Sequence, residues 1–122
     1  MKLILVRHGE TEYNVGHINQ GYLPGLLTTK GIIQAKKAGH LLKKELIAHI
    51  YCSPLERTRE TLSHILKNHE KASVTYAEEL SEHKLGIFEG KPSNSVAEYC
   101  KEHNLAFRSF QPEVADIGTT TK

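Results

Sequence analysis

Residues 5–11, LVRHGET, place a cation and an imidazole side by side directly after an apolar run. Arg7 and His8 follow the branched side chains of residues 3–6, and Gly9 then removes the side chain at the next position. A guanidinium binds phosphate oxygens strongly, and a neutral imidazole can attack phosphorus. A glycine lets a bulky phosphoryl group approach the backbone. This order of residue types predicts phosphoryl chemistry.

A second cationic cluster follows another short apolar run, residues 49–52. In the next segment, Ser53, Pro54 and Glu56 have the spacing of a capping box with proline at the first helical position. Arg57 then lies in the first turn of a helix, where the dipole disfavours a cation unless an anion is bound. We expect Arg7 and Arg57 to form two walls of one phosphate pocket. The ordinary alternative for each arginine is a solvated surface charge.

His8 would lie in that same pocket. Two nearby guanidinium groups disfavour the imidazolium, so they would hold His8 in the neutral form that can act as a nucleophile. The alternative is a histidine that only makes structural hydrogen bonds at the end of a strand.

The periodicity of apolar residues predicts the elements that position these groups. Residues 3–6, 49–52 and 74–76 are predicted strands, the first of them central and covered on both faces. Thr28 is expected to cap a helix whose apolar stripe runs to Leu46 and faces the sheet, and a weaker helix is expected around residues 96–100. Alternating strands and helices predict an α/β fold with right-handed crossovers, in which ligands bind at the carboxyl ends of the strands.

Length and composition set the broad class of protein. The chain has 122 residues, 39% of them hydrophobic, which is enough for one domain, residues 1–122, with an irregular tail over 113–122. A net charge of +2 with dispersed lysines and arginines argues against a nucleic-acid partner. The run 3–6 is too short to span a membrane. Two distant cysteines and the lack of a secretory segment predict a soluble, cytoplasmic protein.

Four motifs carry a resemblance to a known family. In chain order they are LVRHGETEYN, LTTKGIIQA, CSPLERTRET and ELSEHKLGIFEG. Together they resemble the histidine phosphatase superfamily, which includes cofactor-dependent phosphoglycerate mutases. The stretch KLGIFEGKP is most similar to fructose-2,6-bisphosphatases of the TIGAR type. The resemblance implies a three-layer α/β/α, phosphoglycerate mutase-like fold with a mainly parallel sheet.

The resemblance also implies roles for individual residues. His8 would be the nucleophile that forms a phosphohistidine, which water then hydrolyses. Glu82 would be the general acid that protonates the leaving oxygen, its alternative being a solvated loop carboxylate. The residues that would contact phosphate or substrate are Arg7, Asn14, Gln20, Gly21 and Arg57. No metal or other cofactor is implied, and a structural turn is the alternative for Asn14, Gln20 and Gly21.

The sequence also departs from the family pattern. His17 and Glu79 stand where the family usually has arginine, which leaves the substrate open. The superfamily's second catalytic histidine follows a later strand that neighbours the first one, and residues 90–122 supply neither, His103 lying in a polar context. Residues after Pro112 show no family signal. These features predict a sheet that is incomplete at the C-terminus and a truncated, alternatively spliced or frameshifted product of a longer gene.

Three functions remain open at this point. The first is a phosphatase for a small phosphorylated metabolite, such as the sugar phosphate fructose 2,6-bisphosphate. The second is a truncated, non-catalytic phosphate-binding or regulatory isoform. The third, a phosphoglycerate mutase, needs a stable phosphorylated resting enzyme, which nothing in the sequence indicates. The sequence does not define the oligomeric state.

Overall fold

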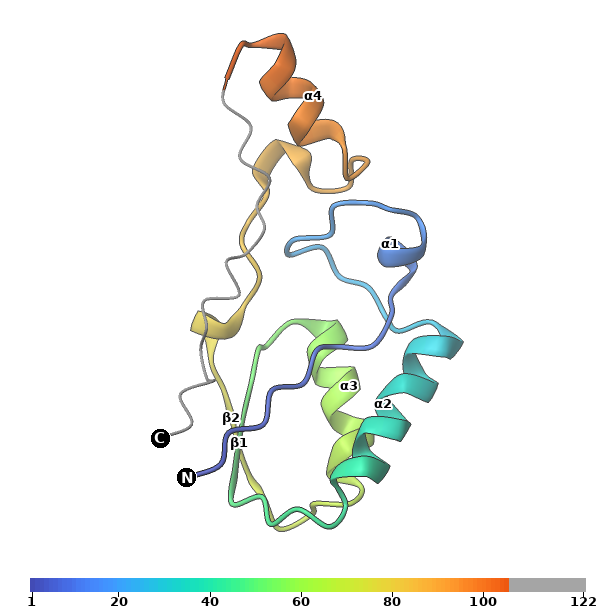
Figure 1. Cartoon of the computed structure of the whole chain (residues 1–122), viewed down its shortest axis with the longest axis vertical. Helices are drawn as coiled ribbons and strands as arrows, with labels where there is room; N and C mark the ends of the chain where they lie inside the picture. Colours follow the sequence, from blue (N-terminus) through green and yellow to red (C-terminus); the bar gives the residue numbers. More distant parts are fainter. Residues whose placement is uncertain (106–122) are drawn as a thin grey trace.

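The computed structural model describes residues 1–105, so the predicted tail over 113–122 lies outside the described residues. The helices and strands, shown in Figure 1, are α1 (Glu12–Val15), α2 (Thr29–Leu42), β1 (His49–Cys52), α3 (Glu56–Leu66), β2 (Ser73–Tyr76) and α4 (Ser95–Glu102). Two short 3-10 helices, η1 (Glu78–Leu80) and η2 (Gly86–Phe88), lie between β2 and α4. The predicted strands at 49–52 and 74–76 and the helix around 96–100 are confirmed.

The two strands pair in parallel, with His49 opposite Ser73 and Cys52 opposite Tyr76. Helix α3 connects them and packs against β1. Because parallel strands share one direction, the loops that leave β1 and β2 begin next to each other. The Ala77 N–H donates a hydrogen bond to the Cys52 carbonyl at 2.9 Å, which extends the pairing into the first residue after β2.

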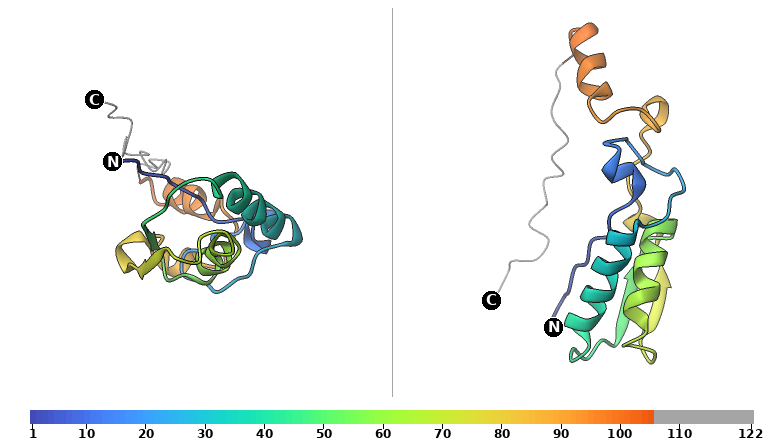
Figure 2. Two further views of the ribbon diagram at one scale, coloured as in Figure 1. Left: turned by 90° about the horizontal axis from the view of Figure 1, so that it is seen from below. Right: turned by 90° about the vertical axis from the view of Figure 1, so that its right-hand side faces the viewer.

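The prediction of a central strand at residues 3–6 is wrong for this structure. The segment forms no strand, and the side chains of Leu3 and Leu5 are 64% and 73% exposed. A strand needs a neighbour that satisfies its backbone groups, and within residues 1–105 none pairs with this segment. Figures 1 and 2 show it as an extended segment leading to α1. The Lys2 ammonium forms an ion pair of 2.7 Å with the Glu45 carboxylate.

Helix α2 packs on α3, and not on the sheet as predicted. The buried positions of α2 are all small residues, Gly31, Ala35 and Gly39. A Cβ atom at Gly39 would lie 3.1 Å from the His64 carbonyl oxygen, so glycine allows the two helix backbones to approach closely. The apolar stripe ends earlier than predicted, since the helix stops at Leu42 and Leu46 is fully exposed.

The predicted cap of α2 is confirmed and allows a first test. The Thr28 Oγ1 accepts a hydrogen bond from the Gly31 N–H at 3.0 Å and lies 3.0 Å from the Glu10 carboxylate, to which it donates. We expect Thr28→Ala to lower the free energy of unfolding by about 1 kcal/mol, because an orphan N–H loses its partner. Urea denaturation measures this change. Thr29→Ala, at an exposed neighbouring position, is the control, and equal losses in both variants would contradict the assignment.

The start of α3 differs from the prediction. Leu55 is the N-cap and makes no side-chain cap, so the helix begins at Glu56, two residues later than a Ser53 cap would place it. The Ser53 hydroxyl instead accepts a hydrogen bond from the Leu55 N–H at 3.3 Å, which forms a local turn before the helix. Arg57 still lies in the first turn of the helix.

Candidate active site

The hydrogen bond of His8 defines the form of its imidazole. The Nδ1 atom lies 2.8 Å from the Gly9 carbonyl oxygen. A carbonyl oxygen can only accept, so in the neutral ring the proton resides on Nδ1 and the lone pair on Nε2. The ring nitrogen that does not face the backbone is therefore the one able to act as a nucleophile or a base.

The electrostatic surroundings of His8 also favour the neutral ring. Partial burial lowers the pKa of His8 below its usual range, and the guanidiniums of Arg57 and Arg7 lower it further. The Gly9 carbonyl and the Glu82 carboxylate oppose this shift. His8, Arg7, Arg57 and Glu82 thus lie within electrostatic range of one another, although they come from three separate parts of the chain.

The lowered pKa of His8 has a consequence for stability. An unfolded histidine binds its proton near pH 6.5, and the folded His8 binds it only at lower pH. The unfolded state therefore gains the proton first, so the stabilisation from His8 is present above about pH 6.5 and is lost as pH falls through the folded pKa. We expect His8→Gln to show a smaller fall in unfolding free energy between pH 7.5 and pH 5 than the original chain. Urea denaturation at both pH values measures it, and equal falls would contradict the shift.

Arg57 is a buried cation. Its exposed fraction is 4%, and its Nε atom has no hydrogen-bond partner among the described residues. Burial lowers the pKa of Arg57, and the Glu82 carboxylate opposes that shift. Desolvating a guanidinium without full pairing costs free energy, which an oxyanion would offset by supplying both charge and acceptors. The environment of Arg57 is thus suited to an anionic ligand.

Thr61 holds the His8 segment against α3, a role that the sequence analysis missed. Its Oγ1 accepts a hydrogen bond from the Gly9 N–H at 3.0 Å and donates to the Arg57 carbonyl at 2.8 Å. The side chain is 4% exposed. Its position four residues after Arg57, on the same helix face, is the only sequence signal, and it does not reveal the partner at Gly9.

Packing against α2 also explains why residue 9 is a glycine. A Cβ atom at this position would overlap the Gly31 carbonyl oxygen of α2. The glycine therefore allows the chain after His8 to cross close to a helix backbone. The predicted approach of a phosphoryl group to Gly9 stays a prediction.

Glu82 follows η1 in the loop after β2 and is exposed. Its Oε1 accepts a hydrogen bond from the His83 N–H at 3.0 Å. The neighbouring Ser81 hydroxyl lies 3.4 Å from the Ser53 hydroxyl, so the loop that carries Glu82 touches the loop that leads to Arg57. The carboxylate affects the pKa of both His8 and Arg57.

Asn14 and Gln20 surround Thr11, which is fully buried. The Asn14 Oδ1 accepts from the Thr11 N–H at 2.9 Å, completing the capping box of α1. The Gln20 Oε1 accepts from the Thr11 hydroxyl at 3.0 Å, and the Gln20 Nε2 donates to the Leu23 carbonyl at 3.2 Å. These bonds build the loop, which is the structural alternative for both residues; their contact with a substrate stays a prediction.

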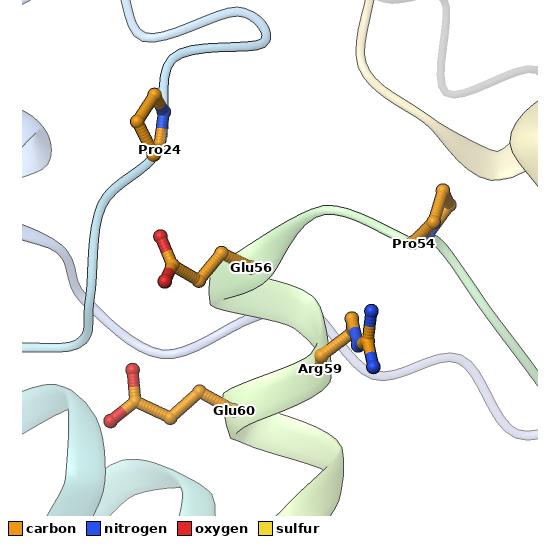
Figure 3. A pocket seen from close by; sticks show the side chains of 5 residues that line it. All are labelled: Pro24, Pro54, Glu56, Arg59 and Glu60. Atoms are coloured by element: carbon orange, nitrogen blue, oxygen red, sulfur yellow. The ribbon is translucent and has the colours of Figure 1, made fainter.

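A pocket of about 610 Å³ lies beside the N-terminal turn of α3 (Figure 3). Its lining residues are Pro24, Pro54, Glu56, Arg59 and Glu60. The two carboxylates hold the loop before α2, because Glu56 accepts from the Gly25 N–H at 3.0 Å and Glu60 accepts from the Leu27 N–H at 2.7 Å. Two carboxylates repel a phosphate, so this pocket is not the site that the sequence predicts.

Two further properties hold for the part of the chain that the structure describes. Within residues 1–105, no three His, Cys, Asp or Glu side chains gather closely enough to bind a metal ion. Over the same residues, no helix has both the length and the apolar character needed to cross a membrane.

Known proteins resemble this chain in both sequence and structure. A model of the histidine phosphatase superfamily (branch 1) matches residues 3–121. The chain is 33% identical over 122 residues to the broad-specificity phosphatase YOR283W of Saccharomyces cerevisiae, covering 96% of this chain and 53% of that protein. It is 34% identical over 114 residues to the fructose-2,6-bisphosphatase TIGAR of Bos taurus, covering 90% and 42%. The crystal structure of phosphoglycerate mutase from Bacillus anthracis matches with a TM-score of 0.72 and 29% identity, over 81% and 45% of the two chains.

These comparisons confirm the phosphoglycerate mutase-like α/β fold class and correct one prediction. The family match reaches residue 121, so the prediction that residues after Pro112 show no family signal is wrong. That prediction relied on short motifs, whereas a family model adds weak similarity over many positions. The chain spans about half the length of the curated relatives it matches, 53% and 42% for the two named above. By its sequence and its fold, the chain belongs to the histidine phosphatase superfamily.

Proposed function

We propose that this chain carries the nucleophile and phosphate-binding part of a phosphatase that acts on small phosphorylated metabolites. The observation that carries the proposal is that a neutral His8, whose Nε2 keeps its lone pair, lies within electrostatic range of the buried guanidinium of Arg57, whose Nε has no partner within residues 1–105. A nucleophile beside a cation without a full set of partners is what phosphoryl transfer to a side chain requires.

The reaction has two steps. In the first, the Nε2 lone pair of His8 forms a bond to phosphorus while the bond from phosphorus to the leaving oxygen breaks, and Glu82 gives a proton to that oxygen. In the second, water attacks the phosphohistidine, Glu82 takes a proton from the water, and the bond to Nε2 breaks to release phosphate. Arg7 and Arg57 hold the non-bridging oxygens, on which negative charge is concentrated in both steps.

The proposed substrate is a sugar phosphate, with fructose 2,6-bisphosphate as the first candidate. One relative is named for this substrate and another for broad specificity, which supports a small phosphate ester. Asn14, Gln20 and Gly21 are the proposed substrate contacts. The loop that carries these residues contacts the segment just after His8, because the Gln20 Oε1 accepts a hydrogen bond from the buried hydroxyl of Thr11.

A second candidate function is a phosphate-binding or regulatory protein without catalysis. The exposure of the segment that leads into His8 favours it, because a nucleophile on an unpaired segment is less rigidly held than one at the end of a paired strand. Such a protein would bind phosphate through Arg57 but would not hydrolyse a phosphate ester.

One experiment separates these two functions. The purified chain is incubated with fructose 2,6-bisphosphate, 3-phosphoglycerate and p-nitrophenyl phosphate, inorganic phosphate release is measured, and binding of phosphate is measured by calorimetry. Release above a protein-free blank is expected. Binding without release favours the non-catalytic function, and the absence of both rejects the phosphate site.

A further inference from the structure

Glu89 joins two loops that are far apart in the sequence. Its Oε1 accepts a hydrogen bond from the Tyr22 N–H at 3.1 Å and another from the Leu85 N–H at 3.2 Å. Tyr22 directly follows the proposed substrate contacts Gln20 and Gly21. Leu85 lies three residues after Glu82, the proposed general acid. One carboxylate oxygen therefore links the two loops on which these groups lie.

Gly21 leaves the space that the Glu89 carboxylate occupies. Its φ of +51° is in the left-handed region, and a Cβ atom there would overlap the Glu89 Oε1. The same Cβ atom would lie 2.9 Å from the Glu89 Cδ, so any side chain at this position displaces the carboxylate. The backbone conformation at Gly21 and the position of the Glu89 carboxylate thus depend on each other.

Other contacts between the two loops do not need the Glu89 side chain. The Asn19 N–H donates to the Lys91 carbonyl and the Gly90 N–H donates to the Asn19 carbonyl, both at 2.8 Å. The Lys84 ammonium lies 5.2 Å from the centre of the Tyr22 ring. Figure 1 shows the loop after α1 running beside the chain that leads into α4. The two backbone hydrogen bonds hold the loops together at residues 90–91, and the Lys84 side chain contacts Tyr22. The Glu89 carboxylate adds a bond to the Leu85 N–H, closer in the sequence to Glu82.

We propose that Glu89 is a positioning residue. It fixes the loop of Glu82 against the loop of Gln20 and Gly21, so that the general acid Glu82 is held in a constant position relative to the bound substrate. The inference rests on the proposed function. Backbone N–H groups bind a carboxylate with charge-assisted hydrogen bonds, which hold a loop more firmly than neutral ones do. In this proposal Glu89 acts through the two loops that it binds and takes no part in the transfer of the phosphoryl group or the proton.

Three variants test this role. Glu89→Gln keeps Oε1 as an acceptor for both N–H groups, so we expect its kcat to stay within about threefold of the original chain, since only the charge is lost. Glu89→Leu has a similar size and no acceptor, and misplacing the acid is expected to lower kcat on the order of 10–100-fold with a smaller change in KM. Glu98→Leu removes an exposed glutamate of α4 whose carboxylate accepts a hydrogen bond from the Asn94 side chain, and it serves as the matched control.

Amide hydrogen exchange at Tyr22 and Leu85 provides a second measurement that does not depend on activity. Faster exchange at both amides in Glu89→Leu, with recovery in Glu89→Gln, supports the proposal. Unchanged exchange in Glu89→Leu overturns it, as does faster exchange with an unchanged kcat. If the original chain releases no phosphate, the proposed function fails while the exchange data still decide whether Glu89 fixes the loops. If Glu89→Leu loses its native circular dichroism, Glu89→Ser replaces it with the same expectations.

Discussion

Replacing His8 with alanine is expected to abolish phosphate release, lowering the rate at least on the order of 10³-fold, because the reaction loses the atom to which phosphorus is bonded. The lone pair of Nε2 and the lowered pKa of His8 make it the nucleophile of the proposed mechanism. Glu82 and Arg57 remain in the variant. Without the nucleophile, however, the ester can react only by direct attack of water, which is slow.

The loss of a covalent intermediate is the specific readout. Rapid quenching of the original chain with a labelled phosphate ester is expected to trap a phosphoenzyme that is stable in base and labile in acid, as a phosphoramidate is. His8→Ala traps none. His40→Ala, which removes an exposed histidine of α2, is the control and keeps both the label and the rate. A labelled intermediate in His8→Ala would assign the nucleophile to another residue.

The elements that the sequence predicted well are those whose signals are local. Strands β1 and β2 and the helix between them have short-range periodicity, and the cap of α2 needs only Thr28 and the N–H three residues later. Residues 3–6 have the apolar character of a buried strand, but a strand also needs a paired neighbour, and the composition of a segment does not supply one. The exposed side chains of Leu3 and Leu5 are the result.

The candidate site divides in the same way. His8 and Arg57 were predicted to lie together because each follows a predicted strand, and the carboxyl ends of such strands lie at one edge. The strand before His8 does not form, and the shared phosphate pocket stays a prediction. Thr61 and Glu89 could not be found, because each binds one backbone N–H group that is more than fifty residues away in the sequence, at Gly9 and at Tyr22. A threonine and a glutamate are common on surfaces, and only the folded chain shows that these two hold loops in place.

Replacing Arg57 with methionine is expected to lower activity without lowering stability. In Arg57→Met the aliphatic volume is largely kept, whereas the guanidinium and its charge are lost. We expect the rate of phosphate release to fall on the order of 10²–10³-fold, as for the loss of a donor that stabilises transition-state charge. The free energy of unfolding is expected to stay the same or to rise by about 1–4 kcal/mol, because an incompletely paired buried cation is replaced by an apolar side chain. Steady-state kinetics and urea denaturation measure the two effects.

Inorganic phosphate provides the control for this pair of effects. A ligand that binds only the folded state raises stability in proportion to the logarithm of its concentration, so the original chain is expected to gain stability with phosphate, and Arg57→Met to gain little. Lys71→Met, which removes an exposed lysine after α3, keeps the gain. Destabilisation of Arg57→Met without phosphate would make the guanidinium a structural group. If Arg57→Met loses the stabilisation by phosphate and its stability without phosphate is unchanged, the guanidinium binds the ligand and does not stabilise the fold. The 4% exposure of Arg57 then reflects a buried ligand-binding group.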